Sequence, residues 1–78
     1  MSDNPHPRTL DVTGLLCPLP VLKARKLLNG MRPGEVLRIL ATDPMAAIDI
    51  PHFCQEQGHS LLSQGQEGSE FHFLVQRR

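Results

Sequence analysis

The hydrophobic and polar positions of this 78-residue chain change their period several times. Residues 9–12, TLDV, alternate so that Leu10 and Val12 share one face, which predicts a short strand with one buried side. Residues 35–41, EVLRILA, alternate in the same way and are rich in aliphatic side chains. They predict a central strand whose fully buried face carries Leu37, Ile39 and Ala41.

The segment from Pro18 to Asn29 predicts an α-helix. Proline suits a first helical turn, where its missing N–H would have had no partner. Apolar residues then recur at helical spacing along one face: Ala24, Leu27, Leu28 and Met31. Asn29 is followed by Gly30, a typical helix end.

A second helix is predicted within residues 42–59. Thr42 or Asp43 can cap its start, and Gly58 is expected to end it. Pro51 should kink this helix or divide it in two, because proline lacks an N–H and clashes with the preceding turn. The side chains expected to pack inward are Met45, Ile48 and Phe53.

Residues 60–65 and 70–76 predict two strands joined as a hairpin. The element order is therefore β-α-β-α-β-β. The expected fold class is α/β (α+β), a two-layer sandwich in which a four-stranded mixed sheet carries both helices on one face. We expect a flexible N-terminal lead-in over residues 1–8 and a single domain over residues 9–78.

Composition and charge narrow the choice of partner. The formal net charge is zero, and the chain has no Trp or Tyr, which disfavours nucleic-acid binding through either a basic surface or base stacking. No apolar run resembles a signal peptide or approaches the ~20 residues of a membrane span. With only two cysteines, a cytoplasmic protein with reduced thiols is expected, and its partner is a small molecule or another protein.

Cys17 lies in the segment GLLCPLP, residues 14–20. If the first helix begins near Pro18, this cysteine lies at or just before the first turn. The unpaired N–H groups and positive dipole end there would favour the thiolate, the nucleophilic form. Gly14, Pro18 and Pro20 predict a rigid corner that presents the sulfur. A lone cysteine is more often a small buried hydrophobic residue, but the rigid corner favours a reactive thiol.

A dithiol site is less favoured. Pro20 occupies the position of the second cysteine in a C-x-x-C motif, so that motif is absent at Cys17. Cys54 is expected to pack within its helix. A redox pair of Cys17 and Cys54 remains an alternative if the fold brings the two together.

The histidines give no clear site. His52, Cys54 and His59 are poorly spaced for zinc because residues two apart do not share a helix face, so no metal is expected. The chain has no Gly-rich phosphate loop, and no cofactor is expected. Cys–His catalysis would need a histidine beside Cys17, and the sequence does not decide which, if any, is there. The four histidines are His6, His52, His59 and His72.

Two segments carry a resemblance to a known family. Residues 10–28, LDVTGLLCPLPVLKARKLL, resemble the signature of the TusA sulfur-carrier family, in which Cys-Pro-x-Pro follows L-D-x-x-G-L. Residues 33–62 are similar to that family's second strand, its D-P helix start and its D-I-P-x-F-C segment. The resemblance covers nearly the whole chain.

The resemblance implies the same β-α-β-α-β-β sandwich and a function. The cysteine that matches Cys17 would accept sulfane sulfur as a persulfide from a cysteine desulfurase, a pyridoxal-phosphate enzyme. It would relay the sulfur to an acceptor protein, in the best-known branch toward 2-thiouridine in tRNA. Other members serve molybdenum-cofactor supply or sulfur oxidation. Such a chain is sulfurtransferase-like rather than a stand-alone enzyme. The alternative is a non-catalytic regulatory or interaction module.

The surface around Cys17 is expected to contact these partners. Leu15, Leu16 and Leu19 would form an apolar collar with Gly14, and the candidate polar contacts are Lys23 and Arg25. Many members of the tRNA branch have Glu where this chain has Leu19, so the corner is expected to be less acidic and more apolar. Cys54 matches the family's second cysteine, which is not the carrier residue.

Overall fold

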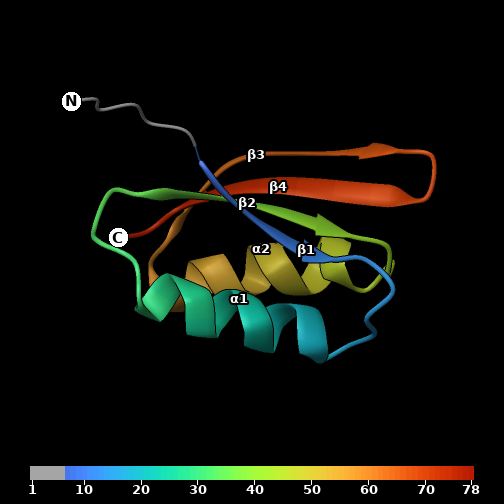
Figure 1. Cartoon of the computed structure of the whole chain (residues 1–78), viewed down its shortest axis with the longest axis horizontal. Helices are drawn as coiled ribbons and strands as arrows, with labels where there is room; N and C mark the ends of the chain where they lie inside the picture. Colours follow the sequence, from blue (N-terminus) through green and yellow to red (C-terminus); the bar gives the residue numbers. More distant parts are fainter. Residues whose placement is uncertain (1–6) are drawn as a thin grey trace.

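Two helices and four strands follow one another in the predicted order (Figure 1). The structure is a computed structural model that describes residues 7–78. Its elements are β1 (Arg8–Val12), α1 (Leu19–Asn29), β2 (Val36–Ala41), α2 (Ala46–Gln57), β3 (Ser60–Glu67) and β4 (Glu70–Gln76). Most of the predicted lead-in, residues 1–6, lies outside the described residues, and Arg8 already belongs to β1.

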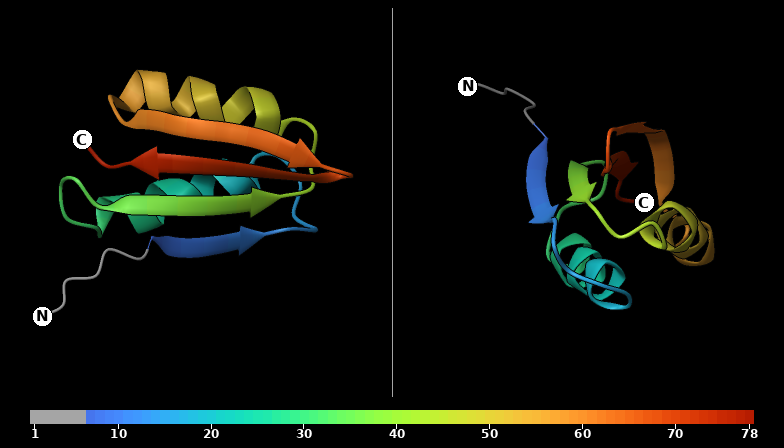
Figure 2. Two further views of the ribbon diagram at one scale, coloured as in Figure 1. Left: turned by 90° about the horizontal axis from the view of Figure 1, so that it is seen from above. Right: turned by 90° about the vertical axis from the view of Figure 1, so that its right-hand side faces the viewer.

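The strands form one mixed sheet in the order β1-β2-β4-β3. β1 pairs with β2 in parallel, whereas β4 pairs antiparallel with both β2 and β3. Both helices cover the same face of this sheet, as the end-on view in Figure 2 shows. The predicted two-layer sandwich is therefore confirmed. Neither helix in residues 7–78 has the length and apolar character needed to cross a membrane.

The core lies between the sheet and the two helices. Leu37, Ile39 and Ala41 of β2 are fully buried, as their alternation predicted. Complete burial of one such aliphatic side chain stabilises the fold by roughly 1.5–3 kcal/mol. The stripe predicted on the first helix also packs inward: Ala24 and Leu28 of α1 are buried and Leu27 is half-buried. Met31, which follows the end of α1, is buried as well.

The inward face of α2 differs from the prediction. Met45 is 45% exposed and Ile48 is 64% exposed, so placing them in the core was wrong. The helix begins at Ala46, and the side chains at helical spacing from that residue face the sheet: Ala46, Ile50, Phe53 and Cys54. Of the three predicted residues, only Phe53 is buried.

Pro51 does not divide α2, which is one helix over Ala46–Gln57. Its ring removes the hydrogen bond to the carbonyl four residues earlier. Packing of Ile50, Phe53 and Cys54 against the sheet holds the turns on either side. Gly58 ends the helix as predicted, with a φ of +80° that favours glycine.

A candidate sulfur site at the start of helix α1

Cys17 lies in the loop between β1 and α1, two residues before the first residue of the helix. Its side chain is exposed, and the thiol is free. Gly14 opens the loop with a φ of +82°, a conformation that favours glycine. Pro18 precedes the helix on the surface, while Pro20 is buried in its first turn. The predicted location, an exposed corner at the helix start, is confirmed.

This loop is tied to the loop between β2 and α2. The N–H of Cys17 donates to Oδ2 of Asp43 over 2.6 Å, and the N–H of Gly14 donates to Oγ1 of Thr42 over 2.8 Å. Oδ1 of Asp43 accepts the N–H of Met45 over 3.0 Å, just ahead of α2. Asp43 is the one polar residue buried among those described, at 8% exposure. Its carboxylate therefore fixes the cysteine loop relative to α2.

Asp49, on the first turn of α2, contacts the sulfur itself. Sγ of Cys17 donates a hydrogen bond to Oδ2 of Asp49 over 3.2 Å. This bond, reinforced by partial desolvation and by the negative charges of Asp49 and Asp43, raises the pKa of Cys17. The sequence expectation of a favoured thiolate is therefore wrong for the isolated chain.

The helix start offers few amides to the sulfur. Pro18 and Pro20 have no N–H, and the N–H of Leu19 donates to the carbonyl of Leu16 over 2.9 Å. The prolines that stiffen the corner thus remove donors that could stabilise a thiolate. Sequence reasoning used the prolines as signs of a helix start and of a rigid corner, and it overlooked the N–H donors that they remove. It also missed Asp49, although that residue opens the D-I-P-x-F-C segment on which the resemblance rested.

The predicted apolar collar is only partly present. Leu16 is 68% exposed and Leu19 44% exposed, whereas Leu15 is half-buried and packs against the core. Three further exposed apolar side chains are Leu22 on α1, Met45 just before α2 and Ile48 in the first turn of α2. We call these five exposed residues the apolar rim: Leu16, Leu19, Leu22, Met45 and Ile48.

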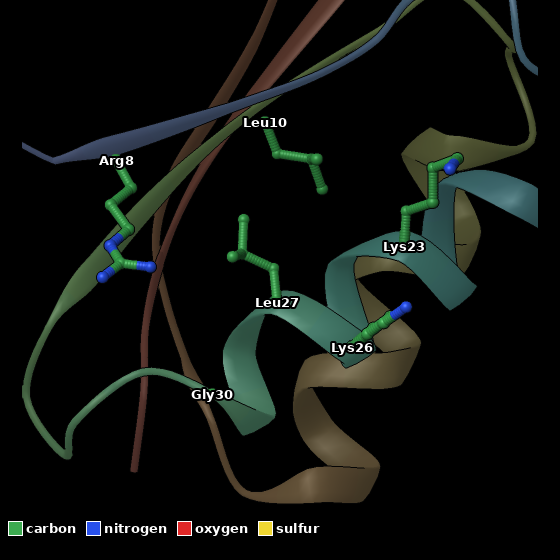
Figure 3. Close-up of a pocket in the computed structure, with 6 residues that line it drawn as sticks. All are labelled: Arg8, Leu10, Lys23, Lys26, Leu27 and Gly30. Atoms are coloured by element: carbon green, nitrogen blue, oxygen red, sulfur yellow. The ribbon is translucent and has the colours of Figure 1, made fainter.

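Lys23 and Arg25, both predicted as polar contacts, line different hollows. Arg25 lies with Pro18 and Asp49 along a hollow of about 270 Å³ between α1 and α2, next to the cysteine corner. Lys23 lines a hollow of about 360 Å³ between β1 and α1 (Figure 3). Within this hollow, Leu10 of β1 and Leu27 of α1 point toward one another. The residues that line the hollow are Arg8, Leu10, Lys23, Lys26, Leu27 and Gly30.

Cys54 is separated from this surface. It is 2% exposed within the core, where burial raises the pKa of its thiol to about 11. The prediction that Cys54 packs within its helix is confirmed. Both thiols are free.

The described histidines are engaged elsewhere. Nε2 of His52 lies 3.3 Å from Glu56 Oε2, and Nδ1 of His59 accepts the N–H of Arg78 over 3.2 Å. The imidazole of His72 lies against Gly65 of the neighbouring strand. His6 lies outside the described residues. Across residues 7–78, no three His, Cys, Asp or Glu side chains are grouped so that they could hold a metal ion.

The chain is similar to known proteins over nearly its full length. A sulfur carrier protein TusA from Allochromatium vinosum is 46% identical over 68 residues, which are 87% of this chain and 90% of that protein. A sulfur carrier protein TusA from Pseudomonas entomophila is 41% identical over 78 residues, which are 100% of this chain and 98% of that protein.

The fold is also found in a solved structure. The crystal structure of a SirA-like protein from Desulfitobacterium hafniense superposes with a TM-score of 0.78 at 20% identity. It covers 87% of this chain and 93% of that protein's chain, so it supports the fold. The sequence model described as Sulfurtransferase TusA matches residues 8–77. This chain therefore belongs to the TusA family.

Proposed function

We propose that this chain is a sulfur carrier in which Cys17 holds sulfane sulfur as a persulfide. One observation carries the proposal: the exposed thiol of Cys17 lies on the loop between β1 and α1, and hydrogen bonds join this loop to the loop between β2 and α2. The second thiol, Cys54, is buried and so cannot serve a protein partner without unfolding. The similarity to proteins named sulfur carriers supports the same conclusion.

The proposed transfer moves the outer sulfur of a donor persulfide to Cys17, so that one S–S bond breaks and another forms. Cys17 loses its proton, and its Sγ attacks the outer sulfur of a donor persulfide. The new Sγ–S bond forms as the donor's S–S bond breaks, and that electron pair leaves on the donor's inner sulfur, which takes up a proton. The sulfane sulfur keeps its oxidation state, so neither an oxidant nor a reductant is consumed.

Delivery is the same exchange in the opposite sense. An acceptor thiolate attacks the outer sulfur on Cys17, and Cys17 leaves as a thiolate that regains its proton. The chain supplies a positioned sulfur and a docking surface, and the partners supply the chemistry that makes and consumes the persulfide. A cysteine desulfurase is the proposed donor, and a relay protein in tRNA 2-thiouridine synthesis is the proposed acceptor.

The apolar rim is the proposed docking surface. Two of its residues, Leu16 and Leu19, flank the cysteine in sequence, and Met45 adjoins the loop that Asp43 ties to it. Exposed apolar side chains with polar neighbours are typical of sites where proteins meet. Arg25 borders this surface, so it remains a proposed polar contact, whereas Lys23 lines the separate hollow beside β1.

The test is sulfur loading followed by intact mass measurement. The protein is incubated with a cysteine desulfurase, pyridoxal phosphate and cysteine. We expect a mass gain of one sulfur atom, absent in Cys17→Ser and retained in Cys54→Ala. Loss of two hydrogens with a link between Cys17 and Cys54 would instead indicate redox chemistry. An unchanged mass with several donors would favour a non-catalytic interaction module.

A further inference from the structure

We infer that Asp49 keeps the resting Cys17 thiol protonated, so that this exposed cysteine becomes nucleophilic only when the Asp49 carboxylate is displaced or neutralised. Asp49 is then a positioning residue that sets when the sulfur can react. Its consequence for sulfur transfer rests on the proposed function of Cys17.

The direction of the hydrogen bond carries this inference. Oδ2 of Asp49 lies 3.2 Å from Sγ of Cys17. An ionised carboxylate can only accept hydrogen bonds, so the proton must be on the sulfur. Loss of that proton would leave a negatively charged sulfur facing a negatively charged oxygen. The contact therefore stabilises the thiol and destabilises the thiolate, which is the attacking form.

The other charged groups near the contact do not reverse this effect. Asp43 adds a second carboxylate, whose Oδ2 lies 2.6 Å from the backbone nitrogen of Cys17. Arg25 of α1 and His52 and Glu56 of α2 line the hollow that adjoins Asp49. His52 is paired with Glu56, and the net effect of these surroundings is to raise the pKa of Cys17.

The contact also distinguishes an empty carrier from a loaded one. In a persulfide, Sγ has no proton to donate, and the ionisable atom is the outer sulfur, one bond farther from Asp49. The hydrogen bond from Sγ to Oδ2 of Asp49 is therefore specific to the empty carrier. An exposed thiol held in this way resists alkylation and oxidation, since both reactions proceed through the thiolate. A docking partner that places a cation against Asp49 would remove the restraint.

The test is the pH dependence of iodoacetamide alkylation at Cys17 in the isolated full-length protein. Peptide masses distinguish modification of Cys17 from that of Cys54. The variants are Asp49→Asn, which keeps the side-chain shape, and Asp49→Ala, which introduces no new hydrogen-bond donor. Glu56→Gln is the matched control, because it neutralises another carboxylate on the same helix that has no contact with Sγ.

For both Asp49 variants we expect the inflection to move to lower pH and the rate at neutral pH to rise roughly threefold or more. Glu56→Gln should follow the unchanged protein. An unshifted profile in both Asp49 variants, or a slower reaction in both, would overturn the inference. Alkylation needs no sulfur donor, so this result is independent of the persulfide assay. If Cys17 takes up no sulfur, the proposed function fails while the role of Asp49 in thiol ionisation is still decided.

Discussion

Cys17 and Asp43 are 26 positions apart in the chain and are joined by a 2.6 Å hydrogen bond from the backbone N–H of the cysteine to Oδ2 of the aspartate. The other oxygen of the same carboxylate accepts the N–H of Met45. One nearly buried side chain therefore sets both the position of the candidate sulfur site and the approach to α2. Hydrogen bonds to a charged acceptor are stronger than neutral ones, and they matter more when little water competes for them.

Replacing Asp43 should destabilise the fold. Asp43→Ala leaves two backbone N–H groups without their acceptors, and the free energy of unfolding should fall by about 1–3 kcal/mol. Urea unfolding followed by circular dichroism measures this change. Asp43→Asn keeps one acceptor oxygen and the side-chain shape, so it should lose less. Equal stabilities of the alanine variant and the unchanged protein would show that the two loops do not depend on this carboxylate.

The apolar rim gives a prediction for partner docking. Leu16→Asp places a charge on a surface proposed to lose water on docking, so sulfur uptake from a cysteine desulfurase should slow by about tenfold. Loading from a small-molecule polysulfide, which needs no protein contact, should be unchanged. Leu62→Asp is the control, because Leu62 is 51% exposed but lies on β3, outside the apolar rim. Equal slowing by both variants would argue against docking at the rim.

Ionisation of the buried Cys54 thiol should destabilise the fold at alkaline pH. Burial raises its pKa to about 11, above the ordinary value near 9. As pH rises through this interval, the unfolded chain releases the proton first, so the free energy of unfolding falls between about pH 9 and 11. The loss should be on the order of 2 kcal/mol. The chain has no tyrosine to titrate in the same range.

The measurement compares urea unfolding of the unchanged protein and Cys54→Ala at a series of alkaline pH values. Cys17 is present in both proteins, so its titration does not enter the difference. The alanine variant should be less stable near neutral pH because it leaves a small cavity, but its decline above pH 9 should be shallower. Parallel declines would mean that Cys54 is not the group responsible.

The sequence was a good guide where one periodic pattern decides burial. Leu37 and Ile39 alternate within β2, and Ala24 and Leu28 recur along α1, so their burial follows from local spacing. Met45 was misplaced because it precedes α2. Ile48 was misplaced because helical spacing from Ala46 turns it outward.

Local sequence patterns could not predict the contact between Cys17 and Asp49. It joins residues 32 positions apart, across two elements whose relative placement comes from packing on the sheet. The exposure of Cys17 followed from its rigid loop, but the protonation of its sulfur depends on this distant carboxylate. A helix start alone therefore did not predict the ionisation of the thiol.

Protonation of His59 should destabilise the fold at acid pH. Burial lowers its pKa below 6.5, as do the nearby charges of Arg78 and Arg77. The unfolded chain then binds a proton that the folded chain does not, so the free energy of unfolding falls as pH drops below the unfolded value near 6.5.

In His59→Asn the side-chain oxygen can still accept the Arg78 N–H but does not titrate. The slope of the free energy of unfolding against pH should therefore be shallower in this variant. His52→Asn is the control, because His52 is exposed and paired with Glu56. Urea unfolding at neutral and mildly acidic pH measures both slopes, and a slope in His59→Asn as steep as that of the unchanged protein would assign the acid sensitivity to another group.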